Sequence, residues 1–204
     1  MTLKLYYSPG ACSLSPHIAL REAGLDFTLE KTDLKTKQTA SGGDIRKDNP
    51  KGYVPVLVLD DGEVLTEGPA IVQWIADRKP ASGLAPAAGT TARYHLMEWL
   101  NFVGTELHKS YSPLFGATVP EEYKAMVRDG LAKKYSFVNE KLAGKSYLMG
   151  ETFTVADGYL FVVTNWARIV KFDLTPYPNV VAFQERVRAR PKVQEAMRAE
   201  GILK

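Results

Sequence analysis

The chain has 204 residues, of which 45% are hydrophobic and 24% are charged, values typical of a folded globular protein rather than a disordered or fibrous one. Its formal net charge of +3 comes from 26 basic and 23 acidic residues spread along the sequence, without the basic stripe of a nucleic-acid-binding protein. The single cysteine excludes an intramolecular disulfide, and the sequence has no run of about 18 apolar residues that would predict a membrane span. We therefore expect a cytoplasmic protein with neither nucleic acid nor membrane as a partner.

The first 80 residues alternate between strand and helix patterns. They predict a strand at 3–7, a helix at 13–23, a strand at 26–32, a hairpin of strands at 56–59 and 63–66, and a helix at 69–79. Gly24 marks the end of the first helix, and Asp61-Gly62 is a typical hairpin turn. Since the first two strands flank a helix, we expect them to be parallel within a small mixed sheet.

The residues after 80 indicate a second domain. The segment 81–89 is dense in Pro, Gly and Ala, which is typical of a linker. Beyond it, apolar residues recur every three to four positions and predict helices at 91–112, 121–142, 154–170 and 179–190. Thr154 and Asp157 have the spacing of a capping box at a helix start. We thus predict a first domain at 1–80, a linker at 81–89 and an all-helical domain at 90–204.

Cys12 lies where the first strand turns into the first helix. A buried core position is the common role of a lone cysteine, but Pro9 and Gly10 break the strand just before the thiol and favour a reactive one. The unpaired N–H groups at a helix start stabilise an anion by about 0.3 to 1 kcal/mol. One pKa unit corresponds to about 1.4 kcal/mol, so further donors are needed to hold Cys12 as a thiolate.

Four motifs, in this order, resemble the cytosolic glutathione S-transferases, and most closely the bacterial beta class. They are Tyr6-Tyr7-Ser8-Pro9-Gly10-Ala11-Cys12-Ser13, Asn49-Pro50-Lys51-Gly52-Tyr53-Val54-Pro55, Leu65-Thr66-Glu67-Gly68-Pro69-Ala70-Ile71 and Thr154-Val155-Ala156-Asp157. The resemblance extends over essentially the whole chain. The resemblance implies an α/β plus all-α fold, in which a thioredoxin-like βαβ-ββα domain precedes an all-helical domain. It also implies glutathione as co-substrate, no metal, and a homodimer.

The resemblance implies where glutathione contacts the first domain. Val54-Pro55 resembles a cis-proline whose preceding residue pairs with an extended peptide ligand. Glu67 matches the acid that binds the γ-glutamyl ammonium, and Gly68 lies where backbone N–H groups at a helix start receive the carboxylate. Lys37 matches a cation for the glycyl carboxylate, although a solvated loop lysine is an almost equally good interpretation of that position.

The helical domain supplies the other implied contacts. At about 100° per residue, Asn101, Thr105 and His108 fall on one face of an α-helix. The family positions that match Thr105, Glu106, Leu107 and His108 approach glutathione. His108 is expected to hydrogen-bond to sulfur or to exchange its proton, since histidine titrates near neutrality. Without the resemblance, a plain surface histidine would be favoured.

The resemblance implies conjugation of the glutathione thiol to small hydrophobic electrophiles. The expected catalytic residues are Cys12, Ser13 and His108, of which the last two would donate hydrogen bonds to the glutathione sulfur. The apolar side chains expected to line the pocket for the hydrophobic substrate are Tyr111, Phe115 and Trp166.

Two other functions stay open. Cys12 can form a mixed disulfide with glutathione, which favours thiol-disulfide exchange, peroxide reduction or reductive dehalogenation. Ser15 stands where a Cys-x-x-Cys motif has its resolving thiol, so a second glutathione must release the first. The third interpretation is a non-catalytic ligand-binding or interaction protein with the same fold, since a fold does not determine a function.

Overall fold

The structure is a computed structural model that describes residues 2–203, and these residues form two compact units. The first unit contains the residues up to Ala85 together with those from Arg190 onward, and the second unit spans Pro86–Ala189. The boundary between the two units, at Ala85 and Pro86, falls inside the linker predicted at 81–89. The second unit differs from the predicted domain of 90–204, because the C-terminal residues pack with the first unit.

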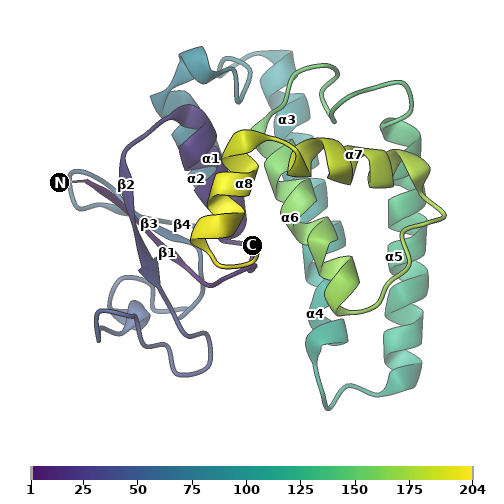
Figure 1. Cartoon of the computed structure of the whole chain (residues 1–204), viewed down its shortest axis with the longest axis horizontal. Coiled ribbons are helices and arrows are strands. Elements are labelled where there is room, and N and C mark those ends of the chain that lie inside the picture. The colour runs from purple at the N-terminus through teal and green to yellow at the C-terminus, as the bar shows by residue number, and fades with distance from the viewer. Residues whose placement is uncertain (1, 204) are drawn as a thin grey trace. The chain divides into compact units, whose positions relative to one another are not determined.

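Within residues 2–203, a mixed four-stranded sheet with the order β2-β1-β3-β4 forms the centre of the first unit (Figure 1). Its strands are β1 (Leu3–Tyr7), β2 (Phe27–Lys31), β3 (Val56–Val58) and β4 (Val64–Thr66). As predicted, β1 is parallel to β2, whereas β3 is antiparallel to both β1 and β4. The predicted hairpin is also confirmed: the Leu59 N–H donates to the Glu63 carbonyl over 2.8 Å, and Gly62 has a φ of 91°.

The helices of the first unit pack around α1. They are α1 (Leu14–Ala23), α2 (Gly68–Arg78) and α8 (Pro191–Ala199), with short 3-10 turns at η1 (Ile45–Lys47) and η2 (Pro80–Ser82). α1 contacts both α2 and α8, and it ends as predicted at Gly24, whose φ is 64°. The apolar side chains that are almost fully buried in this unit include Leu5, Leu14, Ile18, Leu20, Leu57, Ile71 and Ile75. This packing holds the starts of α1 and α2, where the predicted site residues lie.

Polar contacts attach the C-terminal segment to the first unit. The Arg190 guanidinium binds both carboxylate oxygens of Glu22, at 2.7 and 2.9 Å. Glu200 accepts a hydrogen bond from the Gly10 backbone N–H at 2.9 Å, and its other carboxylate oxygen lies 2.8 Å from Nδ1 of the buried His17. The turn before α1 is therefore held from the far end of the chain.

The described residues of the second unit are helical, as predicted. Its elements are α3 (Thr91–Phe102), η3 (Val103–His108), α4 (Lys109–Phe115), α5 (Glu121–Lys141), α6 (Val155–Ile169) and α7 (Pro178–Arg188). Because α3, η3 and α4 follow one another directly, the helix predicted at 91–112 continues to Phe115. η3 is a π-helical stretch, in which the hydrogen bonds run from i to i+5. In the part of the chain that the structure describes, no helix combines the length and the apolar character needed to cross a membrane.

α6 is buried over most of its length and begins with the predicted capping box. The backbone N–H and the hydroxyl of Thr154 each lie 2.8 Å from Oδ2 of Asp157. Oδ1 of Asp157 accepts the Leu148 N–H at 2.8 Å, and the carboxylate is fully buried. Asp157 therefore anchors both the start of α6 and the loop that precedes it.

Candidate functional site

Cys12 lies in a tight turn between β1 and α1. The Ala11 N–H donates to the Ser8 carbonyl and the Leu14 N–H donates to the Ala11 carbonyl, both over 3.0 Å. The Cys12 side chain is half-buried. The Ala11 side chain packs against a hydrophobic cluster that consists of Tyr6, Ile45, Val54 and Val56. The turn is thus fixed against the segment that precedes β3.

The Cys12 thiol reaches the backbone of that segment. Its Sγ donates to the carbonyl oxygen of Val54, 42 residues away in the sequence, over 3.3 Å. The Val54–Pro55 peptide bond is cis, as the resemblance implies. A carbonyl oxygen has two lone pairs, so that of Val54 can accept a second hydrogen bond while it is bound to the thiol. The structure therefore brings the predicted reactive cysteine and the predicted peptide-binding segment together.

Ser13 is placed differently from the expectation that it donates to a ligand sulfur. Its side chain is fully buried. Its hydroxyl accepts the Ser8 N–H at 3.1 Å and donates to the Ser8 carbonyl at 3.3 Å. Because this proton is used inside the protein, the placement argues against a direct catalytic role and gives Ser13 the role of closing the Cys12 turn.

Glu67 and Gly68 lie at the junction of β4 and α2, beside the cis-proline. Glu67 has a φ of 68°, and its side chain is exposed. A Cβ at Gly68 would lie 3.8 Å from Cγ of Pro55, so the start of α2 borders that ring. Sequence reasoning missed Lys51, whose ammonium binds the Glu67 carboxylate and, at 3.2 Å, the Thr66 hydroxyl. No sequence signal distinguishes Lys51 from the other loop lysines except its closeness to the Val54-Pro55 motif.

Lys37 is tied to the same segment. Its Nζ donates to the Gly52 carbonyl at 3.0 Å and lies 5.7 Å from the centre of the Tyr53 ring. Gly52 and Tyr53 directly precede Val54. The residues predicted for the first unit, apart from Ser13, are thus connected through one stretch of backbone at the start of β3.

In the second unit, the π-helical η3 carries the predicted residues 105–108. The α-helical spacing assumed for Asn101, Thr105 and His108 does not apply in this stretch, because each π turn contains more residues than an α turn. Asn101 and Thr105 are exposed, whereas His108 is half-buried. The Thr105 hydroxyl donates to the Asn101 carbonyl at 3.0 Å.

A lysine from another helix supports η3. The Glu106 carbonyl accepts the Ser110 hydroxyl at 2.6 Å and the Lys134 ammonium at 2.9 Å. The same ammonium lies 3.1 Å from the Glu106 carboxylate. Lys134 belongs to α5, so a partner from outside the local sequence satisfies this backbone group.

The His108 ring is fixed by two neighbours. Its Nδ1 lies 2.6 Å from the Tyr159 hydroxyl, and its ring meets Trp166 edge to face, with the ring centres 4.8 Å apart. Both partners come from α6. The orientation of His108 is therefore set by a buried helix.

The residues predicted to line the substrate pocket differ in exposure. The Phe115 side chain is 48% exposed, whereas Trp166 is buried and meets Phe115 edge to face. Tyr111 is fully buried, with its hydroxyl 2.8 Å from that of Tyr135, and burial raises the pKa of Tyr111. Leu107 is also fully buried. The burial of both side chains argues against their direct contact with a ligand, and the predicted ligand-binding roles of Tyr111 and Leu107 stay predictions.

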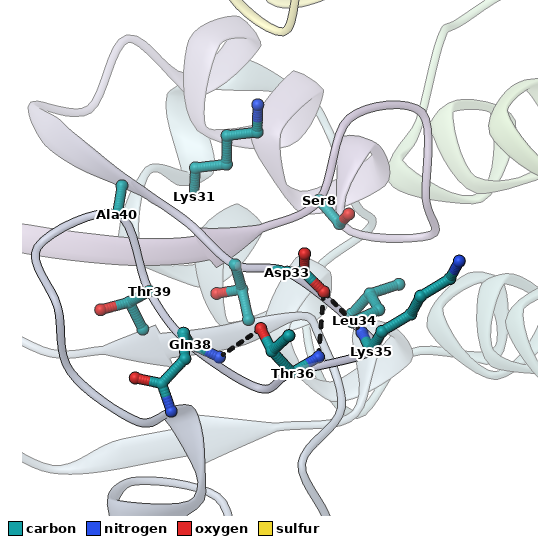
Figure 2. A pocket seen from close by; sticks show the side chains of 10 residues that line it. Ser8, Lys31, Asp33, Leu34, Lys35, Thr36, Gln38, Thr39 and Ala40 are labelled. Carbon is teal, nitrogen blue, oxygen red and sulfur yellow. Dashed lines mark hydrogen bonds between the residues drawn. The ribbon is translucent and has the colours of Figure 1, made fainter.

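A cavity of about 650 Å³ lies beside the loop that follows β2, and Cys12 does not line it. Ser8 and residues 31–36 and 38–40 form its walls. Figure 2 shows the Asp33 carboxylate bound to the backbone N–H groups of Lys35, at 2.7 Å, and of Thr36, at 3.0 Å. These hydrogen bonds lower the pKa of Asp33. Residues 2–203 contain no group of three or more His, Cys, Asp or Glu side chains that could hold a metal ion.

Comparison with known proteins identifies the family. Residues 10–78 match the N-terminal domain of glutathione S-transferases, and residues 101–191 match the C-terminal domain. Glutathione S-transferase GstA of Escherichia coli O157:H7 is 50% identical over 200 residues, which cover 98% of this chain and 100% of that protein. The chain belongs to the glutathione S-transferase family.

Solved structures of glutathione S-transferases show the same fold. A bacterial beta-class enzyme from Sphingomonas chungbukensis is 45% identical with a TM-score of 0.95, covering 98% of this chain and 100% of that one. A sphingomonad glutathione S-transferase in complex with glutathione is 46% identical with a TM-score of 0.94, covering 98% and 99%. The predicted family and the thioredoxin-like plus all-helical fold are confirmed.

Proposed function

We propose that this chain joins the sulfur of reduced glutathione to small hydrophobic electrophiles, so that RX and glutathione give a thioether and HX. The main support is the 3.3 Å contact between the Cys12 thiol and the Val54 carbonyl, beside the cis peptide bond to Pro55. The related sphingomonad protein was solved with glutathione bound, which supports the same ligand for this chain.

Glutathione docks on the first unit as an extended peptide. Its cysteinyl N–H donates to the Val54 carbonyl, which places the ligand sulfur next to the Cys12 side chain. The γ-glutamyl ammonium binds the Glu67 carboxylate, and the γ-glutamyl carboxylate binds the Gly68 N–H at the start of α2. Lys37, whose ammonium lies at the Gly52 carbonyl just before Val54, binds the glycyl carboxylate.

Conjugation then follows from proximity and from a sulfur held as a thiolate. The thiolate displaces X from the electrophile, and the proton and X leave as HX. In the second unit, Asn101, Thr105, Glu106 and His108 stay predicted glutathione contacts. The exposed Phe115 ring and the Trp166 ring that meets it edge to face stay the predicted contacts for an apolar substrate.

A redox activity is the second candidate, because the residue in the turn is a thiol rather than a hydroxyl. The Cys12 thiolate attacks a glutathione mixed disulfide RSSG, forms a Cys12–glutathione disulfide and releases RS⁻. A second glutathione thiolate then attacks that disulfide, releasing oxidised glutathione and the Cys12 thiolate. This cycle needs a reducing compartment, in agreement with the expected cytoplasmic location.

An assay with two substrates tests these functions. We expect the wild-type chain to conjugate glutathione to 1-chloro-2,4-dinitrobenzene. Reduction of a glutathione mixed disulfide without conjugation would favour the redox function instead. Binding of apolar compounds without either activity would leave only a binding protein.

Replacing Glu67 with alanine tests the γ-glutamyl site. We expect about tenfold weaker binding of S-methylglutathione, since a partly exposed charge-assisted hydrogen bond is lost. Calorimetry measures the affinity, and Glu63→Ala, at an exposed position of the same hairpin, serves as the control. An unchanged affinity in Glu67→Ala would contradict the proposed position of the ammonium.

We also propose that the chain forms a homodimer through its second unit. Apolar side chains are exposed on α3 and α5, among them Tyr94 at 60% and Met126 at 69%. Large exposed apolar surfaces are typical of interaction sites. Sedimentation velocity at micromolar concentration is expected to show a dimer, and Tyr94→Lys is expected to shift it toward the monomer. A wild-type monomer at that concentration would refute the dimer.

A further inference from the structure

An exposed ion pair lies at the proposed γ-glutamyl site. The Lys51 ammonium binds Oε1 of Glu67 and the Thr66 hydroxyl. The Lys51 and Glu67 side chains are 44% and 69% exposed. An ion pair this accessible to water contributes little to folding stability, so a stabilising role does not explain its presence.

The backbone beneath both charges is fixed. Lys51 lies in a turn that the Gly52 N–H closes by donating to the Asn49 carbonyl over 2.8 Å. The Lys51 N–H also donates to the Asn49 side chain, at 3.3 Å. Glu67 lies between β4, which pairs with β3, and the first turn of α2. One positive and one negative group are therefore held side by side with their charged ends in water.

We propose, on the basis of the glutathione-binding function proposed above, that Lys51 and Glu67 together bind the zwitterionic end of the γ-glutamyl group. That end carries an ammonium and a carboxylate on the same carbon atom. On docking, Glu67 exchanges the Lys51 ammonium for the ligand ammonium, and Lys51 binds the ligand carboxylate. One ion pair becomes two, and the sum of the four charges is zero, so no unpaired charge remains. Lys51 thereby selects ligands that carry the α-carboxylate.

Other roles of Lys51 give different affinity patterns. A lysine that only occupied Glu67 would compete with the ligand ammonium, and its removal would tighten binding. If Lys51 only positioned the Glu67 carboxylate, its removal would lower the affinity for every ligand that carries an ammonium. In the proposed receptor, removal of Lys51 weakens only the ligands that carry the carboxylate.

Calorimetry with three S-methylated tripeptides separates these patterns, and S-methylation prevents reaction with Cys12. The ligands are S-methylglutathione, its analogue with a 4-aminobutyryl group, which lacks the α-carboxylate, and its analogue with a glutaryl group, which lacks the ammonium. The variants are Lys51→Met, Lys51→Arg, which keeps the charge, and Lys47→Met, which removes an exposed lysine four residues away. Thermal unfolding verifies that each variant is folded.

We expect Lys51→Met to bind S-methylglutathione and the glutaryl analogue about three- to fivefold more weakly than wild type does. This is the range expected for the loss of an exposed charge pair. The 4-aminobutyryl analogue should bind Lys51→Met at least as tightly as wild type, because it loses a competitor for Glu67 and has no α-carboxylate that Lys51 could bind. Lys51→Arg should keep most of the affinity for S-methylglutathione, and Lys47→Met should have no effect on it. Tighter binding of S-methylglutathione by Lys51→Met, or equal weakening of all three ligands, would overturn the proposal. No binding of S-methylglutathione by the wild-type chain would instead refute the glutathione function, and the receptor with it.

Discussion

The Cys12→Ala variant is expected to lose thiol-disulfide exchange with a glutathione mixed disulfide by at least about 10²-fold, because that reaction needs a covalent bond to the Cys12 sulfur. Conjugation to 1-chloro-2,4-dinitrobenzene should fall by less than about tenfold, since the nucleophile there is the glutathione sulfur. Both rates are measured with the same preparation. The two activities are thereby separated by a single side chain.

Cys12→Ser is the matched control for this experiment. A hydroxyl keeps a donor beside the Val54 carbonyl, which the wild-type thiol reaches at 3.3 Å, but it cannot form a disulfide. We expect it to lose disulfide exchange as completely as Cys12→Ala. Exchange that survives in both variants would show that Cys12 is not the redox group. Conjugation that falls together with exchange would place Cys12 in the conjugation step as well.

The Asp157→Ala variant is expected to destabilise the chain by about 3 kcal/mol at pH 7, because it leaves buried donors without an acceptor. The donors are the backbone N–H groups of Leu148 and Thr154 and the Thr154 hydroxyl, each 2.8 Å from the carboxylate. Urea unfolding measures the loss. Asp129→Ala, at an exposed position on α5, should change the free energy of unfolding by less than about 0.5 kcal/mol. A loss of that small size for Asp157→Ala would contradict the anchoring role.

The cost of removing Asp157 should also depend on pH. Burial raises the pKa of Asp157 to about 6, although the hydrogen bonds donated by Leu148 and Thr154 oppose this shift. A carboxyl whose pKa is higher in the folded chain than in the unfolded one stabilises the fold fully below pH 4, and this contribution is lost as the pH rises through 6. The difference in unfolding free energy between wild type and Asp157→Ala should therefore be larger at pH 4 than at pH 7. The opposite slope would show that the hydrogen bonds outweigh burial.

Features that depend on a few neighbouring residues were predictable from the sequence. Gly24 ends α1 because a helix stops readily at a residue with positive φ, and its φ is 64°. The turn at Gly62 and the capping box of Thr154 with Asp157 follow from short-range rules of the same kind. Cys12 and the Val54-Pro55 pair were found as motifs, and the structure places them in contact.

Features that depend on partners far apart in the sequence were not predictable. α8 joins the first unit through pairs such as Arg190 with Glu22, which no local pattern reveals. The π-helical η3 is supported by Lys134, 28 residues beyond Glu106, so the sequence around it reads as an ordinary α-helix. Apolar spacing placed Tyr111 on a helix, but it could not show whether that ring faces a ligand or the core.

In the proposed function, glutathione docks on the Val54 segment with its sulfur beside Cys12. The most direct test compares the rates at which Cys12 forms a mixed disulfide with oxidised glutathione and with 2-hydroxyethyl disulfide, followed by intact-protein mass spectrometry. Because docking raises the local concentration of the reacting sulfur, we predict a rate constant at least about 10²-fold higher for oxidised glutathione, and addition of one glutathionyl group. Equal rate constants for the two disulfides would contradict the docking site.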